Sequence, residues 1–263
     1  MRKHLYLLGA YFSQFLKTRL AYKWDFFISV FTSFTATVLS LMFVWVIFGK
    51  IPRLKDWSFD EVLFLYGFSL VPFGLFNVVS LNLYQFSENY LVEGRFDRVL
   101  LRPLDSLYQV LFESFRLESL QEVLTGLVVM YYAASHLGHP LQWDDLFWFP
   151  VALISAAVIY LSIFLLFTSV SFWFEDRIGI VPPVYNMITF SRYPLTIYNP
   201  VIQFVLSWLI PFAFASFYPA SRFLRRGEFA VYFYLVPAVA VFFFALALAL
   251  WRLGVRHYNS TGT

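Results

Sequence analysis

The chain has 263 residues, of which 60% are hydrophobic and only 13% are charged, and its mean hydropathy is +0.68. This composition excludes an ordinary soluble domain. The net charge is only +3, and no basic cluster resembles a nucleic-acid-binding face, so no nucleic-acid partner is expected. Because there is no cysteine, disulfides, thiolate metal sites and cysteine nucleophiles are excluded.

The N-terminal residues 1–25 predict an interfacial helix with one apolar face. Five Lys or Arg residues precede the first long apolar stretch, which predicts a cytoplasmic N-terminus. No small-residue cleavage site follows a short apolar core, so we expect the first membrane helix to act as an uncleaved signal.

Uncharged stretches long enough to cross a bilayer follow along the chain. A helix needs roughly 20 apolar residues to cross the hydrocarbon core. Four strongly apolar stretches of that length contain no Asp, Glu, Lys or Arg: 26–48, 62–84, 146–174 and 229–251. The fold class predicted is therefore an all-α, polytopic membrane protein with a single transmembrane domain over residues 1–263.

A further span is predicted near 117–134, where the apolar run lengthens again. It begins with Glu118 and Glu122, which lie one turn apart on one face. Carboxylates inside a membrane can line a pathway or relay protons. Both residues also lie near the predicted cytoplasmic interface, where Arg116 or lipid headgroups would neutralise them, and the sequence favours this second interpretation.

The segment 174–227 is apolar but is interrupted by prolines. One span followed by a re-entrant helical hairpin over 193–221 fits this pattern better than two straight helices, because proline removes backbone donors. Irregular backbone at membrane depth persists only where it is buried in protein or lines a wet cavity. The prolines are Pro182, Pro183, Pro194, Pro200, Pro211 and Pro219.

Six spans place both termini on the cytoplasmic side. In this topology 12 of the 19 Lys and Arg residues lie on the cytoplasmic side and 7 outside, as the positive-inside rule requires. The outer cluster of Arg222, Arg225 and Arg226 is the weakest point of that count.

Motifs for catalysis are absent from the sequence. The Gly49-Lys50 pair is followed by Ile51, so there is no phosphate-binding loop for ATP. His136 and His139 lie near two aspartates in a predicted outer loop, but loop histidines are usually only solvated, so no metal site is expected. We therefore expect no enzyme activity and no cofactor bound by this chain.

The loop 85–116 contains the strongest local signal. Residues 93–104 predict a short amphipathic helix that ends at Pro103. Phe96, Val99 and Leu100 form its apolar edge, while the charged side chains are available to a partner. The alternative is an interfacial helix that rests on lipid headgroups.

This loop resembles the Gly-x-x-Asp-x-x-Leu-x-Arg-Pro signature of permease subunits in the ABC-2 type family of bacterial ABC transporters. The positions that match are Gly94, Asp97, Leu100, Arg102 and Pro103. The proline-marked segment from Tyr193 to Ala220 also resembles the region before the last helix of that family. The polar outer loops are short, unlike those of family members with large extracellular domains.

The resemblance implies the permease of an ATP-driven exporter in a bacterial plasma (inner) membrane. ATP and Mg would be bound by separate ATPase subunits, and a second permease, identical or related, would complete the pathway. Phe96 or Leu100 would enter a groove of the ATPase. The implied coupling residues are Glu93, Gly94, Arg95, Phe96, Asp97, Arg98, Leu100, Arg102 and Pro103, and the candidate pathway or gating residues are Glu118, Glu122, Pro194, Pro211 and Pro219.

Two other classes of protein remain as alternatives. A membrane-embedded enzyme acting on lipid would need a convergent His, Asp or Glu cluster, and the sequence offers only Glu118 and Glu122. A non-transporting assembly or sensor bundle would leave the coupling-like loop and the proline-broken segment without a role. Copurification with an ATPase chain separates the first class from the other two.

Overall fold

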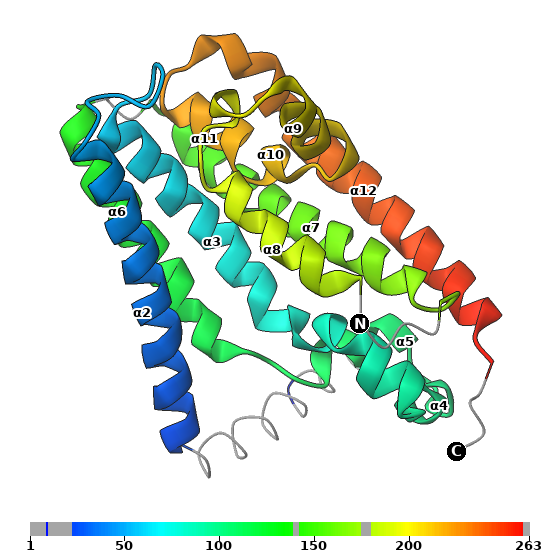
Figure 1. Cartoon of the computed structure of the whole chain (residues 1–263). Coiled ribbons are helices and arrows are strands. Elements are labelled where there is room, and N and C mark those ends of the chain that lie inside the picture. The colour runs from blue at the N-terminus through cyan, green and yellow to red at the C-terminus, as the bar shows by residue number, and fades with distance from the viewer. Residues whose placement is uncertain (1–8, 10–22, 139–141, 175–179, 260–263) are drawn as a thin grey trace.

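A computed structural model describes residues 9, 23–138, 142–174 and 180–259 of the chain, and these residues form helices without a β-strand (Figure 1). The chain is therefore all-α, as predicted. The predicted interfacial helix at 1–25 lies almost entirely outside the described residues.

Four long apolar helices are candidate membrane spans. Each covers all or most of one of those four apolar stretches of the sequence. In α3 the helical path continues into a π-helical segment, η1 (Ser87–Val92). The four helices are α2 (Lys23–Phe48), α3 (Phe59–Tyr84), α7 (Asp145–Val170) and α12 (Ala230–His257).

Two further helices lie where the sequence predicts the third and fifth spans. Helix α6 (Leu120–Leu137) has 18 residues but carries polar side chains in its first and last turns, so it is less apolar than the four long helices. Helix α8 (Val181–Ser191) has only 11 residues. The described residues hold four candidate spans, or five if one bent helix pair counts as a span, so the six-span topology stays a prediction.

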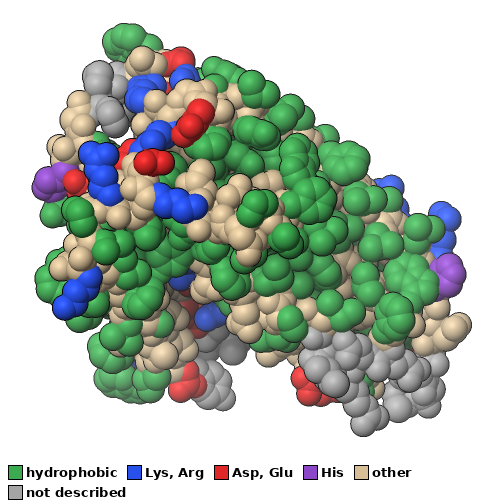
Figure 2. Space-filling view, turned by 45° about the horizontal axis from the view of Figure 1, so that its top comes forward, with side chains coloured by type: hydrophobic (Ala, Val, Ile, Leu, Met, Phe, Trp, Pro, Cys, Tyr) green, Lys and Arg blue, Asp and Glu red, His purple; other side chains and the backbone are tan. Residues whose placement is uncertain are grey.

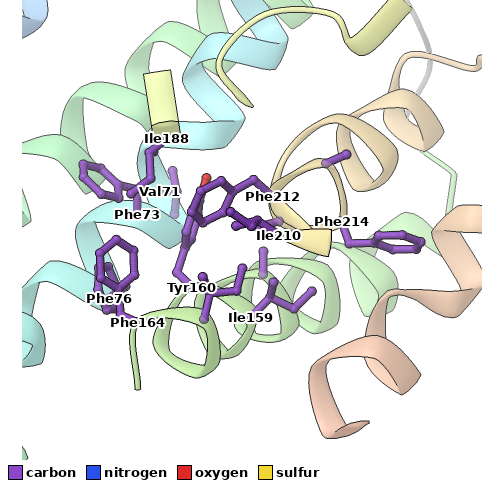
Figure 3. Packing of buried hydrophobic residues seen from close by; sticks show 14 of the residues in the cluster. Val71, Phe73, Phe76, Ile159, Tyr160, Phe164, Ile188, Ile210, Phe212 and Phe214 are labelled. Atoms are coloured by element: carbon purple, nitrogen blue, oxygen red, sulfur yellow. The ribbon is translucent and has the colours of Figure 1, made fainter. Parts of the chain in front are cut away.

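Helix α3 is the central helix of the bundle. It is buried along most of its length and packs against both α6 and α7, while α12 packs along α7. Aromatic side chains from α3, α7 and the short helix α10 (Phe212–Ala215) meet beside it, together with Ile188 of α8 (Figure 3). The ring centres of Phe76 and Phe164 are 4.7 Å apart, and those of Tyr160 and Phe212 are 5.6 Å apart.

Helix α2 lies on the outside of the bundle. Its large apolar side chains point away from the rest of the chain, including Phe31, which is 71% exposed, and Trp45, which is 66% exposed. Only an apolar surrounding makes such a surface favourable, since exposed apolar patches of this size are rare in soluble monomers. The face fits contact with lipid or with another membrane protein.

Two glycines allow α3 and α6 to cross at close range. A Cβ atom placed on Gly126 would lie 2.6 Å from the carbonyl oxygen of Gly67, and one on Gly67 would lie 2.9 Å from that of Gly126. Small residues at helix crossings are the usual means by which membrane helices approach one another. This contact fixes α6 against the central helix.

The connections gather at two opposite ends of the bundle (Figure 1). The helices α4 (Arg95–Leu100) and α5 (Ser106–Phe112) lie near the C-terminal end of α12. The α2–α3 connection lies at the opposite end, together with α11 (Phe217–Phe223). The α4 end is the one where the sequence analysis places the cytoplasm.

Candidate coupling surface and transport path

The predicted amphipathic helix is present as α4. It begins after Gly94, whose φ of 69° lies in the left-handed region that favours glycine. It ends at Leu100, three residues before Pro103. Local backbone preferences therefore explain both residues that bracket the motif. The glycine allows the chain to turn sharply out of η1, and the proline follows the end of the helix.

Phe96 lies inside the chain and not on its surface. It is 0% exposed, and its ring centre is 5.6 Å from that of Phe86, 5.3 Å from that of Phe172 and 5.0 Å from that of Tyr258. Trp251 completes this group, which we call the aromatic cluster. Of the two side chains predicted to enter a groove of the ATPase, Phe96 is already packed against the ends of α3, α7 and α12, whereas Leu100 is 44% exposed.

The exposed face of this loop carries two leucines instead. Leu101 is 84% exposed and Leu100 is 44% exposed. Arg98, Arg102 and Pro103 beside them are also exposed. Leu101 was missed by the sequence reasoning, although the adjacent leucine pair before Arg-Pro was a visible signal. We call Arg98, Leu100, Leu101, Arg102 and Pro103 the docking face.

Other motif residues contact the rest of their own loop. Arg95 forms an ion pair with Glu93 at 2.8 Å, with both side chains about half exposed. Such a surface pair contributes roughly 0–1 kcal/mol to stability. The buried Gln109 of α5 donates from Nε2 to the carbonyl oxygens of Val99 (3.0 Å) and Leu104 (3.2 Å), so it holds the turn after α4 in place.

The C-terminal end of α12 joins this arrangement. Trp251 Nε1 donates to Ser106 Oγ at 3.1 Å, which links α12 to the start of α5. Burial, and secondarily the nearby Asp97 carboxylate, raises the pKa of Tyr258 to about 12. Tyr258 is therefore neutral near pH 7, and Asp97 of the motif lies beside an uncharged phenol. The sequence could not show these contacts, because the partners lie far apart along the chain.

Glu118 and Glu122 occupy different environments. Glu118 lies in the short helix η2 (Leu117–Ser119) and is only 3% exposed. The Oε2 atom of Glu122, on α6, accepts a hydrogen bond from Asn77 Nδ2 of α3 at 3.1 Å. The same Nδ2 atom lies 3.4 Å from the hydroxyl of Tyr185 on α8. Asn77 thus connects three helices through a small polar group in an otherwise apolar region.

The segment 193–221 is helical in short pieces, as its prolines predict. Pro194 precedes η3, Pro211 lies at the main break and Pro219 lies inside α11. The two halves, Pro200–Leu209 and Phe212–Phe223, meet at an angle of 71°, which suits a broken span or a re-entrant loop. Before the break, the segment forms η3 (Leu195–Ile197), α9 (Pro200–Phe204) and the π-helical η4 (Val205–Leu209).

The three arginines that follow α10 each pair with a carboxylate at the end opposite α4. Arg222 pairs with Asp144, Arg225 pairs with Asp145 at 2.6 Å, and Arg226 pairs with Glu61 at 2.7 Å. The guanidinium of Arg226 also lies 4.4 Å from the ring centre of Trp57. These arginines are the ones that weakened the positive-inside argument. Their ion pairs hold α11 and η5 (Gly227–Phe229) against the starts of α3 and α7.

Arg226→Gln is expected to lower the free energy of unfolding by about 1–3 kcal/mol, because it leaves the partly buried Glu61 carboxylate without its cation. Thermal unfolding of the purified protein in neutral detergent measures this effect. Arg53→Gln is the matched control, since Arg53 is exposed at the same end of the bundle. Equal losses in the two variants would contradict a stabilising role for the Arg226–Glu61 pair.

Among the described residues no group of three His, Cys, Asp or Glu side chains could hold a metal ion. The candidate His136 lies near the end of α6, and its suggested partner His139 lies outside the described residues.

The fold and the site together define a multi-pass helical membrane protein with a short helix presented beyond the end of its bundle. A family model for the ABC-2 family transporter protein matches residues 34–262, and the chain belongs to that family. It is thus a permease component of an ABC transporter, a class that works with ABC ATPase partners and is not itself catalytic. No curated protein and no solved structure matches the chain significantly.

Proposed function

We propose that the chain is the permease of an ATP-driven exporter in a bacterial plasma (inner) membrane, with six spans and both termini in the cytoplasm. Family membership carries the transport function. The arrangement of α4 beyond the bundle, together with the 12-to-7 distribution of Lys and Arg, supports a cytoplasmic location for that end.

In this proposal ATP and Mg are bound by separate ATPase subunits that contact the docking face. Leu100 and Leu101 supply exposed apolar contact, and Arg98 and Arg102 supply charge beside it. A central apolar residue with a polar rim is a typical arrangement of an interface hot spot. Phe96 transmits force within the permease instead of contacting the ATPase.

A second permease, identical or related, completes the pathway in this proposal. The apolar, exposed face of α2 supports such a contact, since it is suited to a helix of another membrane protein as well as to lipid. Glu118, Glu122 and the broken element at 193–221 are proposed to line or gate the pathway. In this role the 193–221 hairpin re-enters the membrane from the outer side.

Copurification with the ATPase subunit tests this function. Leu101→Ala should weaken association with the ATPase by roughly 30-fold or more, because truncation of an interface anchor costs about 2 kcal/mol. Leu124→Ala is the matched control, since Leu124 is 65% exposed but lies on α6, away from the docking face. A wild-type chain that never copurifies with an ATPase would rule out the proposed function.

A further inference from the structure

Arg192 directs its charge into the bundle. The residue follows the end of α8, yet its Nη1 atom donates to the hydroxyl of Tyr66 at 3.2 Å, and Tyr66 is 0% exposed. Its guanidinium carbon also lies 5.5 Å from the ring centre of Phe73. Tyr66 and Phe73 lie roughly 10 and 20 Å along α3 from its first residue, at 1.5 Å per residue. The charge of Arg192 therefore lies at membrane depth.

This arginine has no carboxylate partner among the residues that the structure describes. The contrast with Arg222, Arg225 and Arg226 is clear, since each of those forms an ion pair. Glu122 interacts electrostatically with Arg192 from a distance, but its Oε2 atom is bonded to Asn77 and no ion pair joins it to Arg192. The guanidinium charge is thus not locally neutralised.

An unpaired cation in a membrane interior is costly, and such residues commonly mark ligand or ion sites. A guanidinium carries five N–H donors, of which the contact with Tyr66 uses one. The faces of Tyr66 and Phe73 attract the cation but accept no strong hydrogen bond. The remaining donors suit an acidic group, because the planar guanidinium binds carboxylate and phosphate oxygens in pairs.

The segment that carries Arg192 also exposes apolar surface. Phe190, two residues before Arg192, is 44% exposed and large. Figure 2 shows a face of the molecule that is largely hydrophobic, with most of its charged side chains gathered toward the upper left. A ligand with a charged head and an apolar tail would contact both kinds of surface.

We propose that Arg192, held in place by its hydrogen bond to the Tyr66 hydroxyl, binds the acidic headgroup, phosphate or carboxylate, of an amphipathic molecule. The site deepens the proposed function, because as part of a permease it would select acidic amphiphiles as cargo. Arg192 supplies the countercharge and the paired donors. Exposed apolar side chains of the same segment, such as Phe190, pack against the apolar part of the molecule.

Thermal unfolding of the purified full chain in neutral detergent tests the site. Lysophosphatidylglycerol and oleate should raise the melting temperature of the wild type, whereas uncharged monoolein should not. Arg192→Gln should weaken the apparent affinity for both acidic amphiphiles at least tenfold. Arg192→Lys, which keeps the charge but loses the paired donors, should retain an intermediate affinity. Arg252→Gln, which changes an exposed arginine at the α4 end, should bind like the wild type.

Each other outcome overturns a stated part of the proposal. Equal stabilisation of the wild type and Arg192→Gln would remove Arg192 from any site. Equal stabilisation by inorganic phosphate and lysophosphatidylglycerol would show a free-anion site instead of an amphiphile site. Because the measurement uses the permease alone, its failure leaves ATPase association untouched. A failure of ATPase association would likewise leave this binding result standing.

Discussion

Phe96→Ala is expected to destabilise the permease and to detach α4 from its bundle. The ring is fully buried among Phe86, Phe172 and Tyr258, so its removal leaves a cavity that the surrounding rigid rings fill poorly. Loss of a buried phenylalanine side chain typically costs about 3–5 kcal/mol. Thermal or denaturant unfolding in neutral detergent measures the loss of stability.

Leu101→Ala separates the two roles of this loop. Leu101 is 84% exposed, so its truncation should leave the melting temperature nearly unchanged while it weakens ATPase association. Phe96→Leu, which keeps much of the apolar volume, should fall between the wild type and Phe96→Ala in stability. Phe96→Ala with wild-type stability would show that the aromatic cluster does not hold α4.

The contrast between Phe96 and Leu101 shows where sequence reasoning ends at this site. The helix itself was predictable, because Gly94 and Pro103 bracket it through local backbone preferences that need no tertiary contact. Which apolar side chain points inward was not predictable. That choice depends on Phe172 and Tyr258, which reach α4 only after the whole bundle has assembled.

The arginines at the opposite end of the bundle show that ion pairs, too, could not be predicted from the sequence. A count of Lys and Arg residues treats Arg222, Arg225 and Arg226 as three free positive charges on the outer side. Taken that way, they weaken the argument for the predicted topology. In the structure each of them faces a carboxylate at the start of a helix that is distant in the sequence. The sequence contained Glu61, Asp144 and Asp145, but nothing local indicates which basic side chain each one meets.

Apolar length predicted four membrane helices whether they are mostly exposed, like α2, or mostly buried, like α3. The four uncharged stretches became the four longest helices. Helix α6 was harder to define, because its first turn carries Gln121 and Glu122, and Glu122 bonds to Asn77 instead of facing lipid. Prolines correctly marked 193–221 as broken, yet the 71° angle between its halves depends on packing that sequence alone does not encode.

Gly126→Ala is expected to separate α6 from the central helix. A Cβ atom at Gly126 would lie 2.6 Å from the carbonyl oxygen of Gly67, a distance at which backbone atoms must move. It would also crowd Val71 and Leu70, so no single flexible side chain can relieve the strain. Overpacking of this kind typically costs about 1–3 kcal/mol, and movement of α6 would also strain the 3.1 Å bond between Asn77 and Glu122.

Gly227→Ala is the matched control for this change. A Cβ atom on Gly227 would meet nothing within 4 Å, so the same added methyl group should leave the melting temperature unchanged. Thermal unfolding of both variants in neutral detergent therefore compares one methyl group at a closed helix crossing with one in open space. Equal melting temperatures for Gly126→Ala, Gly227→Ala and the wild type would mean that α3 and α6 do not approach this closely. The polar contact of Glu122 with α3 would then lose its structural basis as well.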